Sequence, residues 1–510
     1  MTAAAIVAGL VAAALADWRW LLVAQREHYL AGSATRFALR WWRRGPNLVL
    51  AGAAVLGVVL SPITPAAGIV GALAVASGPF GFPVRPRSPG PLVWTTRLRT
   101  VAAVTGGIQI VVVAGAALIG AGVPVAGIVA LVSPLTVDGV LAGLRPLEDR
   151  RAGRFVEQAR RRLEAVGPDV VAITGSYGKT TTKRYAAHLM AGAKRVVPSP
   201  ASFNNRAGLS RAVNEQLAPG TEVFIAEMGT YGPGEIAALV EWCRPRVAAI
   251  TAIGPVHLER FGTEDAILRA KAEILEGADV AVLNVDDPRL AALAGDLERA
   301  GRTVVRSASV DRSAEVVATA DGDRLVLLRS GVTLGAASLP DAPLEDVAVA
   351  AALALAVGVP TETVAAALGS LPEVPNRRTL TPLSTGAVAV DDTFNSNPAG
   401  CRAALATMAR HATAGGRRVV VTPGMVELGP VQVEENRRWA ALAARQATHV
   451  LLVGATNRAA LLAGAAEVAD AERAVVVVVD RHDQAVRWVR AHTGPADIVL
   501  YENQLPDHYP

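Results

Sequence analysis

The most informative stretch of the chain reads Val170-Val171-Ala172-Ile173-Thr174-Gly175-Ser176-Tyr177-Gly178-Lys179-Thr180-Thr181-Thr182. Its apolar, β-branched beginning predicts a buried parallel strand, and residues 185–190 behind it predict a helix. A strand, a glycine-rich turn, Lys-Thr and a helix follow in the order that a phosphate-binding loop requires. The chain is therefore expected to have an α/β fold with a nucleotide site at this turn.

The residue types in this turn suit the phosphates of a nucleotide. Glycine lets the backbone N–H groups turn inward, where they and the start of the following helix attract negative charge. Lys179 is expected to reach the β- and γ-phosphates, and the hydroxyl of Thr180 is expected to bind Mg²⁺. The expected nucleotide-binding residues of this turn are Gly175, Ser176, Tyr177, Gly178, Lys179, Thr180 and Thr181.

The spacing Gly-x-x-Gly-Lys-Thr-Thr is shorter than the general phosphate-loop pattern and resembles the Mur ligases and the folylpolyglutamate synthetases. Segments that resemble Mur ligases follow in family order: Ser202-Phe203-Asn204-Asn205-Arg206-Ala207-Gly208, Glu227-Met228-Gly229, Pro233-Gly234-Glu235-Ile236, residues 250–259, Arg269-Ala270-Lys271-Ala272-Glu273-Ile274 and residues 283–288. The resemblance implies an ADP-forming ligase that activates a carboxylate as an acyl phosphate, which an amine then attacks.

The resemblance also implies ATP as substrate and a site for two Mg²⁺ ions. Thr180 and Glu227 match the family's ligands of the first ion, and His257 matches a ligand of the second. Lys271 matches a lysine that CO₂ carbamylates in the family, which turns a cation into an anion able to hold Mg²⁺. Lys179, His257 and Lys271 are thus the expected catalytic residues, because phosphoryl transfer depends on positioning and on neutralising the γ-phosphate.

A further segment of resemblance begins near residue 374. Arg377, in a sequence similar to the family's linker, is expected to contact a nucleotide phosphate. Residues 388–398 are similar to a family strand and turn, in which Asp392 would contact ribose and Asn395 would line the nucleotide site. A Rossmann-like domain is predicted because helical stretches alternate with apolar runs at 418–422, 449–454, 474–479 and 497–501.

The chain departs from the family pattern in three places. Ala342 and Pro343 stand where the family has a His-Asn pair whose Asn reads adenine. Pro423-Gly424-Met425 replaces Gly-Asp-Met, although the following Val-Glu-Leu-Gly matches. Residues 501–510 replace a Lys-Gly-Ser segment near the incoming amino acid, so the amine pocket is expected to differ. This C-terminal tail is either part of a site or an exposed end.

The first third of the chain has the pattern of membrane helices. No charged residue occurs at 45–84 or at 101–137, and a helix needs about 20 apolar residues to cross a bilayer. Turns at 61–65 and 120–124 would divide each run into two helices, and residues 3–24 would form a first crossing. Arginines cluster at 26–44, 85–99 and 145–154. Five crossings place all three of these segments in the cytoplasm and the N-terminus outside. The alternatives are a re-entrant first pair and a cleaved signal peptide, but no basic region precedes the apolar stretch.

These signals predict a transmembrane region at 1–146, an amphipathic connector at 147–166, a central ATP-binding domain at 167–374 and a Rossmann-like domain at 375–510. In the connector, Phe155, Ala159, Leu163 and Val166 are spaced three or four residues apart, which predicts an amphipathic helix. Such a helix could lie on the membrane surface or be a solvated linker. A net charge of +5 is too small to indicate nucleic acid as a partner. Two cysteines without metal-ligand spacing favour a reduced compartment.

The expected protein is therefore a multi-pass protein of the bacterial cytoplasmic membrane with its ligase domains in the cytoplasm. Its partners would be membrane lipids, an amino-acid or peptide amine, and a lipid-linked carboxylate acceptor used in cell-envelope synthesis. Three rivals stay open: a ligase similar to poly-γ-glutamate synthases, a nucleotide-dependent membrane switch without ligase activity, and a phosphate-loop kinase, against which the contexts of Lys271 and His257 argue.

Overall fold

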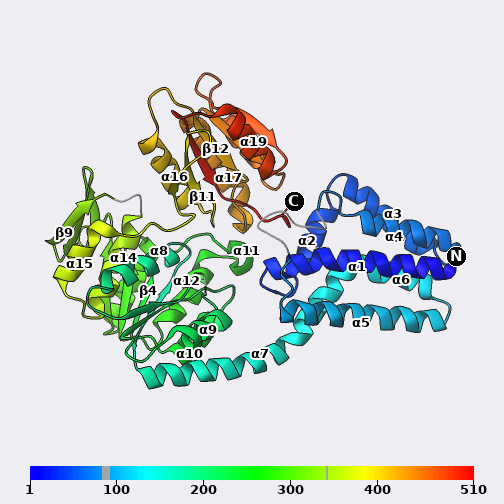
Figure 1. Ribbon diagram of the computed structural model, residues 1–510, viewed down its shortest axis with the longest axis horizontal. Helices are drawn as coiled ribbons and strands as arrows, with labels where there is room; N and C mark the ends of the chain where they lie inside the picture. Colours follow the sequence, from blue (N-terminus) through cyan, green and yellow to red (C-terminus); the bar gives the residue numbers. More distant parts are fainter. Residues whose placement is uncertain (83–91, 202, 340–342, 395, 510) are drawn as a thin grey trace. The chain divides into compact units, whose positions relative to one another are not determined.

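A computed structural model describes residues 1–82, 92–201, 203–339, 343–394 and 396–509. The chain forms two compact units, one made of Met1–Arg150 with Leu505–Pro510 and the other of Arg151–Gln504 (Figure 1). The first unit is built of helices, and the second contains two sheets with helices packed on them. The second unit confirms the expected α/β fold class.

The helical unit consists of α1 (Thr2–Arg26), α2 (Ser33–Trp42), α3 (Pro46–Leu60), α4 (Pro65–Ser77), α5 (Thr96–Leu118), α6 (Gly122–Leu131) and the first part of α7 (Ser133–Val166). Among the described residues, α1 and α5 are each long and apolar enough to cross a membrane. The number rises to four if each bent pair, α2 with α3 and α6 with α7, counts as one span. The break between α3 and α4 confirms the first expected turn, and the break between α5 and α6 lies slightly before the second, since α6 already begins at Gly122. Five crossings stay a prediction.

Small residues allow the helices of this unit to approach closely. A Cβ on Gly57 of α3 would lie 2.5 Å from the Cα of Gly71 on α4, so any larger residue at position 57 would push the two helices apart. Such contacts are common between helices in lipid, where van der Waals packing drives association. The buried carboxylate of Asp17 accepts hydrogen bonds from Gln109 at 3.0 Å and from Ser133 at 2.5 Å. These bonds join α1 to α5 and α7.

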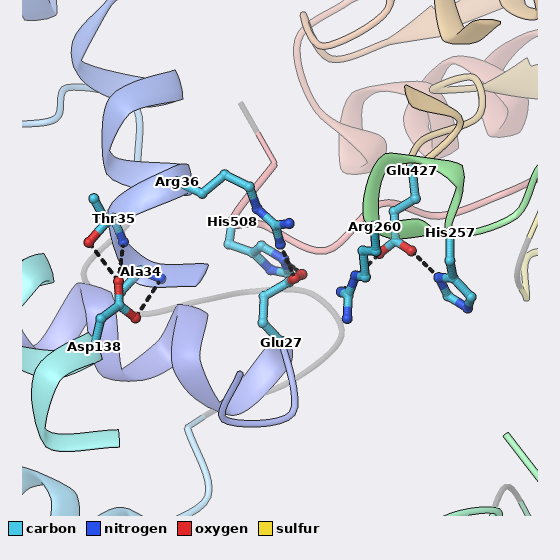
Figure 2. A network of polar contacts seen from close by, with 9 residues as sticks. All are labelled: Glu27, Ala34, Thr35, Arg36, Asp138, His257, Arg260, Glu427 and His508. Atoms are coloured by element: carbon cyan, nitrogen blue, oxygen red, sulfur yellow. Dashed lines mark hydrogen bonds and ion pairs between the residues drawn. The ribbon is translucent and has the colours of Figure 1, made fainter. Parts of the chain in front are cut away.

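The C-terminal tail belongs to the helical unit. The indole N–H of Trp41 donates to the carbonyl oxygen of His508 at 2.9 Å. Nε2 of His508 lies 3.1 Å from Oε1 of Glu27, and Figure 2 shows these two side chains. The Phe37 ring meets the rings of His508 and Tyr509 edge to face, with centroids 4.7 and 5.0 Å apart. His508 is only 2% exposed, so the alternative of an exposed end is wrong.

The larger sheet of the second unit positions the phosphate loop. Its strand order is β2-β3-β1-β4-β5-β6-β7-β8-β9, parallel as far as β7 and antiparallel beyond it. The strands are β1 (Asp169–Thr174), β2 (Val196–Pro198), β3 (Val223–Glu227), β4 (Val247–Ile250), β5 (Val280–Asn284), β6 (Thr303–Ala308), β7 (Val316–Asp321), β8 (Arg324–Arg329) and β9 (Val332–Ser338). Because β1, β3 and β4 are parallel neighbours, their carboxyl ends meet at one edge of the sheet.

Helices cover both faces of this sheet, as the continuous apolar strands require. Val170 and Ala172 of β1 pack in one core, and Val171 and Ile173 pack in the other. The first core lies under α7, α9 (Arg206–Gln216), α10 (Glu235–Cys243), α12 (Glu264–Ala272) and α13 (Pro288–Arg299). The second lies under α8 (Lys179–Met190), α14 (Leu344–Ala356) and α15 (Thr361–Ala367). The short helix α11 (Leu258–Phe261) follows β4.

The expected connector is the end of α7, and its apolar face packs on protein. Ala159 and Leu163 are buried in the first core, and Val156 and Val166 pack against it. Phe155, which was expected in the same stripe, is 62% exposed. A helix turns about 100° per residue, so Phe155 points away while Val156 takes the inward position. The last turns of α7 are therefore part of the central domain.

The smaller sheet confirms the expected Rossmann-like domain. Its order is β10-β11-β15-β12-β13-β14, parallel except for β10. The elements are β10 (Thr379–Pro382), β11 (Val388–Asp392), β12 (Arg418–Thr422), β13 (His449–Val453), β14 (Val475–Val479) and β15 (Ile498–Glu502), with α16 (Pro398–His411), α17 (Gln432–Gln446), α18 (Arg458–Ala466) and α19 (His482–His492). Asp392 and Glu502 end two adjacent strands.

Candidate active site

The phosphate loop joins β1 to α8 and has the backbone geometry expected for one. Gly178 precedes α8 with a φ of +83°, and a Cβ there would collide with the carboxylate of Asp346. Ser176 donates through its hydroxyl to the carbonyl oxygen of Gly254 at 3.1 Å, which ties the loop to the end of β4. Only glycine fits at position 178, for reasons of both conformation and space.

Two lysines converge on the carbonyl oxygen of Gly175. Nζ of Lys179 donates to it at 2.7 Å and Nζ of Lys271 at 3.0 Å. Burial lowers the pKa of both amines, and that of Lys271 falls well below its usual value because the charge of Lys179 adds to the effect of burial. Lys271 is 3% exposed, and its environment shifts the protonation equilibrium toward the neutral amine.

Glu227, at the end of β3, is the centre of a polar cluster. Its Oε2 accepts a hydrogen bond from the Thr180 hydroxyl at 2.9 Å and lies 2.8 Å from Nζ of Lys183. Its Oε1 accepts from the amide of Asn204 at 3.3 Å. Sequence reasoning missed Lys183, which also donates to the carbonyl oxygen of Ala201 at 2.5 Å. The available signal was its position four residues after Lys179 on one helix face.

His257 precedes α11 in a left-handed backbone conformation and faces the loop after β12. Its Nδ1 is hydrogen-bonded to Oε2 of Glu427, and the Tyr231 ring meets the imidazole edge to face at 5.1 Å. Burial lowers the pKa of His257, although the hydrogen bond to Glu427 acts in the opposite direction. His257 and Lys271 are thus both held in environments that disfavour their protonated forms.

A pocket lies between the phosphate loop, the linker and the ends of β11 and α16. The residues that line it include Tyr177, Gly178, Thr181, Thr251, Pro343, Glu345, Asp346, Arg377, Arg378, Asp392, Phe394 and Asn397. The guanidinium of Arg377 lies over the Phe394 ring at 4.8 Å. Burial, with the charge of Glu502, raises the pKa of Asp392 to about 7. Asn395 lies outside the described residues.

Comparison with known proteins identifies the family. Residues 173–334 match the model of the Mur ligase middle domain, and residues 376–501 match that of the Mur ligase glutamate ligase domain. The UDP-N-acetylmuramoyl-tripeptide–D-alanyl-D-alanine ligase of Mycobacterium tuberculosis H37Rv is 34% identical over 427 residues, which cover 76% of this chain and 82% of that protein. This chain belongs to the Mur ligase family.

Other members of the Mur ligase family are also similar to this chain in sequence or in structure. The enzyme of the same name from Escherichia coli K12 is 29% identical over 60% of this chain and 67% of that protein. The crystal structure of MurF from Acinetobacter baumannii matches with a TM-score of 0.59 at 23% identity, over 69% of this chain and 77% of that one. MurF from Thermotoga maritima in complex with ADP gives the same TM-score at 22% identity, over 69% and 80%. The chain is an ATP-dependent, Mg²⁺-using ligase that forms peptide bonds.

The pocket of this Mur ligase places Pro343 where the sequence expectation had it and adds two acidic residues. Pro343 caps α14 and lines the pocket without offering a polar side chain, and Ala342 lies outside the described residues. The acidic residues Glu345 and Asp346, which sequence reasoning missed, line the same region. Burial raises the pKa of both, and Asp346 also accepts a hydrogen bond from Thr182 at 3.2 Å.

The unmodified side chains of this Mur ligase supply oxygen ligands for one Mg²⁺ ion. Within the described ranges, no group of three or more His, Cys, Asp and Glu side chains is placed to hold a metal. The hydroxyl of Thr180 and the carboxylate of Glu227 are adjacent oxygens, which is the ligand chemistry that Mg²⁺ prefers. An unmodified Lys271 offers no oxygen, so its participation requires a covalent change such as the expected carbamylation.

Proposed function

We propose that the helical unit holds this Mur ligase in the cytoplasmic membrane with its ligase domains in the cytoplasm. The observation that carries the proposal is a belt of exposed apolar side chains on α3, α4 and α5. On these helices they are Leu48, Val49, Val55, Leu56, Val59, Leu60, Val70, Leu73, Ile108, Ile110, Val111, Val112 and Leu118, and Ile63 and Ile119 lie in the turns that follow α3 and α5. So many large apolar side chains exposed on neighbouring helices are costly in water and suit lipid.

The reaction we propose follows from the residues at the carboxyl ends of β1, β3 and β4. An acceptor carboxylate attacks the γ-phosphorus of ATP, which gives an acyl phosphate and ADP; an amine then displaces phosphate to form the amide. Lys179 and Arg377 hold the phosphates and offset their negative charge. Thr180 and Glu227 would hold Mg²⁺, which when bound would neutralise phosphate charge. His257 would contribute Nε2 to a second ion.

Lys271 is proposed to carry a carbamate. Carbamylation joins the neutral amine of a lysine to CO₂ with loss of a proton, so it needs a lysine that is not protonated. The low pKa of Lys271, caused by burial and by the charge of Lys179, favours that form. A carbamate would supply two oxygen ligands for Mg²⁺ where the amine supplies none, and its N–H could still donate to the carbonyl of Gly175, which Nζ of Lys271 now contacts at 3.0 Å.

The substrates we propose are an envelope precursor with a free carboxylate and an amino acid or short peptide with a free amine. The relatives are named for a muramoyl tripeptide and D-alanyl-D-alanine, so a cell-wall peptide is the nearest substrate class. We propose further that the acceptor is linked to lipid. A membrane-held active site meets lipid-linked substrate in a thin layer, which raises its effective concentration; a soluble substrate gains no such advantage.

A ligation assay with matched soluble and lipid-linked acceptors tests this proposal. The full protein is compared with a fragment that begins at Arg151, because a fragment that begins at Gly167 would lose Ala159 and Leu163 from the core. The full protein should prefer the lipid-linked acceptor, and the fragment should lose that preference. Equal use of both acceptors by the full protein would contradict the lipid-linked substrate. ADP release that is independent of added amine would favour a nucleotide switch instead.

A further inference from the structure

Glu427 reaches from the loop after β12, in the Rossmann-like domain, to the loop after β4 in the central domain. One carboxylate oxygen is bonded to Nδ1 of His257, and the other lies 3.7 Å from the guanidinium of Arg260 (Figure 2). Its backbone carbonyl also accepts from the N–H of Glu259 at 3.3 Å. We infer that Glu427 is a positioning residue that orients His257 for metal binding.

The backbone at both ends of this contact is held in an uncommon conformation. His257 and Glu427 each have a φ of +63°, in the left-handed region that non-glycine residues seldom adopt. Such a backbone conformation is strained and persists where the surrounding structure holds it in place. A Cβ on Gly429 would lie 3.1 Å from the backbone nitrogen of Glu259, so the two loops are closely packed. The left-handed turns are what aim the two side chains at each other.

The contact sets which nitrogen of His257 is available. A neutral imidazole has one N–H donor and one lone-pair acceptor, and a carboxylate at Nδ1 fixes the proton there. Nε2 is then left with its lone pair, the form in which histidine binds metals. Tyr231, whose own ring lies 4.6 Å below the guanidinium of Arg260, packs against the imidazole and restricts its rotation.

The arrangement links the metal site to contact between the two domains. His257 belongs to the central domain, but the group that fixes its proton belongs to the Rossmann-like domain. His257 is therefore correctly oriented only while the loops that contain Glu427 and Glu259 are packed together. This inference rests on the metal role proposed for His257, and the purely structural rival is that Glu427 only helps to join the domains.

A double-mutant cycle on the full-length protein distinguishes a role of Glu427 in orienting His257 from a role in joining the domains only. The variants are Glu427→Gln, His257→Ala and the double variant, with Glu434→Gln as control because Glu434 is an exposed partner of Arg438 in the same domain. The readouts are the affinity for Mn²⁺ alone, measured by electron paramagnetic resonance, and kcat and KM for ATP. Loss of an outer carboxylate commonly weakens metal affinity or activity by about 10–100-fold.

The expected result is that Glu427→Gln lowers Mn²⁺ affinity and kcat by about 10-fold or more, with little change in the KM for ATP. It should cause no further loss in the His257→Ala background, because it acts through His257. Unchanged Mn²⁺ affinity in Glu427→Gln, or losses that add in the double variant, would overturn the inference. If His257→Ala keeps the wild-type affinity for Mn²⁺, His257 is not a metal ligand. That result would refute the proposed metal site as well as the positioning role of Glu427.

Discussion

Replacing Lys183 with methionine is expected to destabilise the central domain and to misplace Glu227. The Lys183 ammonium lies 2.8 Å from Oε2 of Glu227, and both side chains are almost wholly buried. The same ammonium donates to the carbonyl of Ala201, whose φ of +40° is uncommon for alanine. Methionine keeps most of the aliphatic chain, so the change removes the charge and both polar contacts while leaving the volume nearly constant.

The magnitude follows from the burial of the pair. Removing one partner of a buried ion pair costs about 3–5 kcal/mol, because the other charge is left uncompensated. Glu227 would keep hydrogen bonds from Thr180 and Asn204, so the lower end, about 3 kcal/mol, is expected. In a domain of roughly 150–250 residues, 1 kcal/mol corresponds to about 2–4 °C, which gives a fall in Tm of roughly 6–12 °C.

The assay is thermal unfolding of the full-length protein with Lys183→Met, Glu227→Gln and the double variant. Lys194→Met is the matched control, because its ammonium forms only a half-exposed pair with Glu222 at 3.8 Å, and exposed pairs contribute about 0–1 kcal/mol. The double variant should recover much of the loss, since no unpaired charge remains. A Lys183→Met protein that melts within about 2 °C of wild type, or a double variant that loses the sum of both single changes, would refute the reasoning.

Four further outcomes are expected. Lys179→Ala should abolish ATP turnover in a folded protein, and undiminished activity would remove the phosphate-loop assignment. Lys271→Ala should lose activity and regain part of it with short-chain carboxylates, whereas full activity without them would show that Lys271 is not a metal-site residue. Because Asp392 has a raised pKa in the folded protein, it keeps a proton that the unfolded chain releases; its contribution to stability should therefore fall between about pH 4 and about pH 7. The Tm difference between wild type and Asp392→Asn should change across that window, and a constant difference would contradict the assignment. His508→Ala should release the C-terminal tail, and trimming by carboxypeptidase that is no faster than in wild type would show that the ring contacts do not hold the tail.

Local sequence was sufficient for the features that depend on neighbours along the chain. The phosphate loop between β1 and α8 is one continuous segment, so residue types and spacing predict it directly. The apolar runs of the first third predict helices and their turns, because helix length and composition are local properties. The strands of the Rossmann-like domain follow from short apolar runs at regular intervals, and four of them begin within one residue of their expected positions.

Only the tertiary structure decided which distant residues meet. Glu427 and His257 are 170 residues apart, and His508 and Glu27 are 481 apart, so no local pattern relates either pair. Lys183 could be seen as a lysine on a helix, but its ion pair with Glu227 depends on β1 and β3 being neighbours in the sheet. The inward face of α7 was misjudged at Phe155 for a related reason, because spacing defines a stripe but the packed core selects which residues enter it. Residues that are neighbours along the chain determine the individual helices and strands. The order of the strands and the packing of the core determine which distant side chains share a site, and the chemistry of this ligase depends on those shared sites.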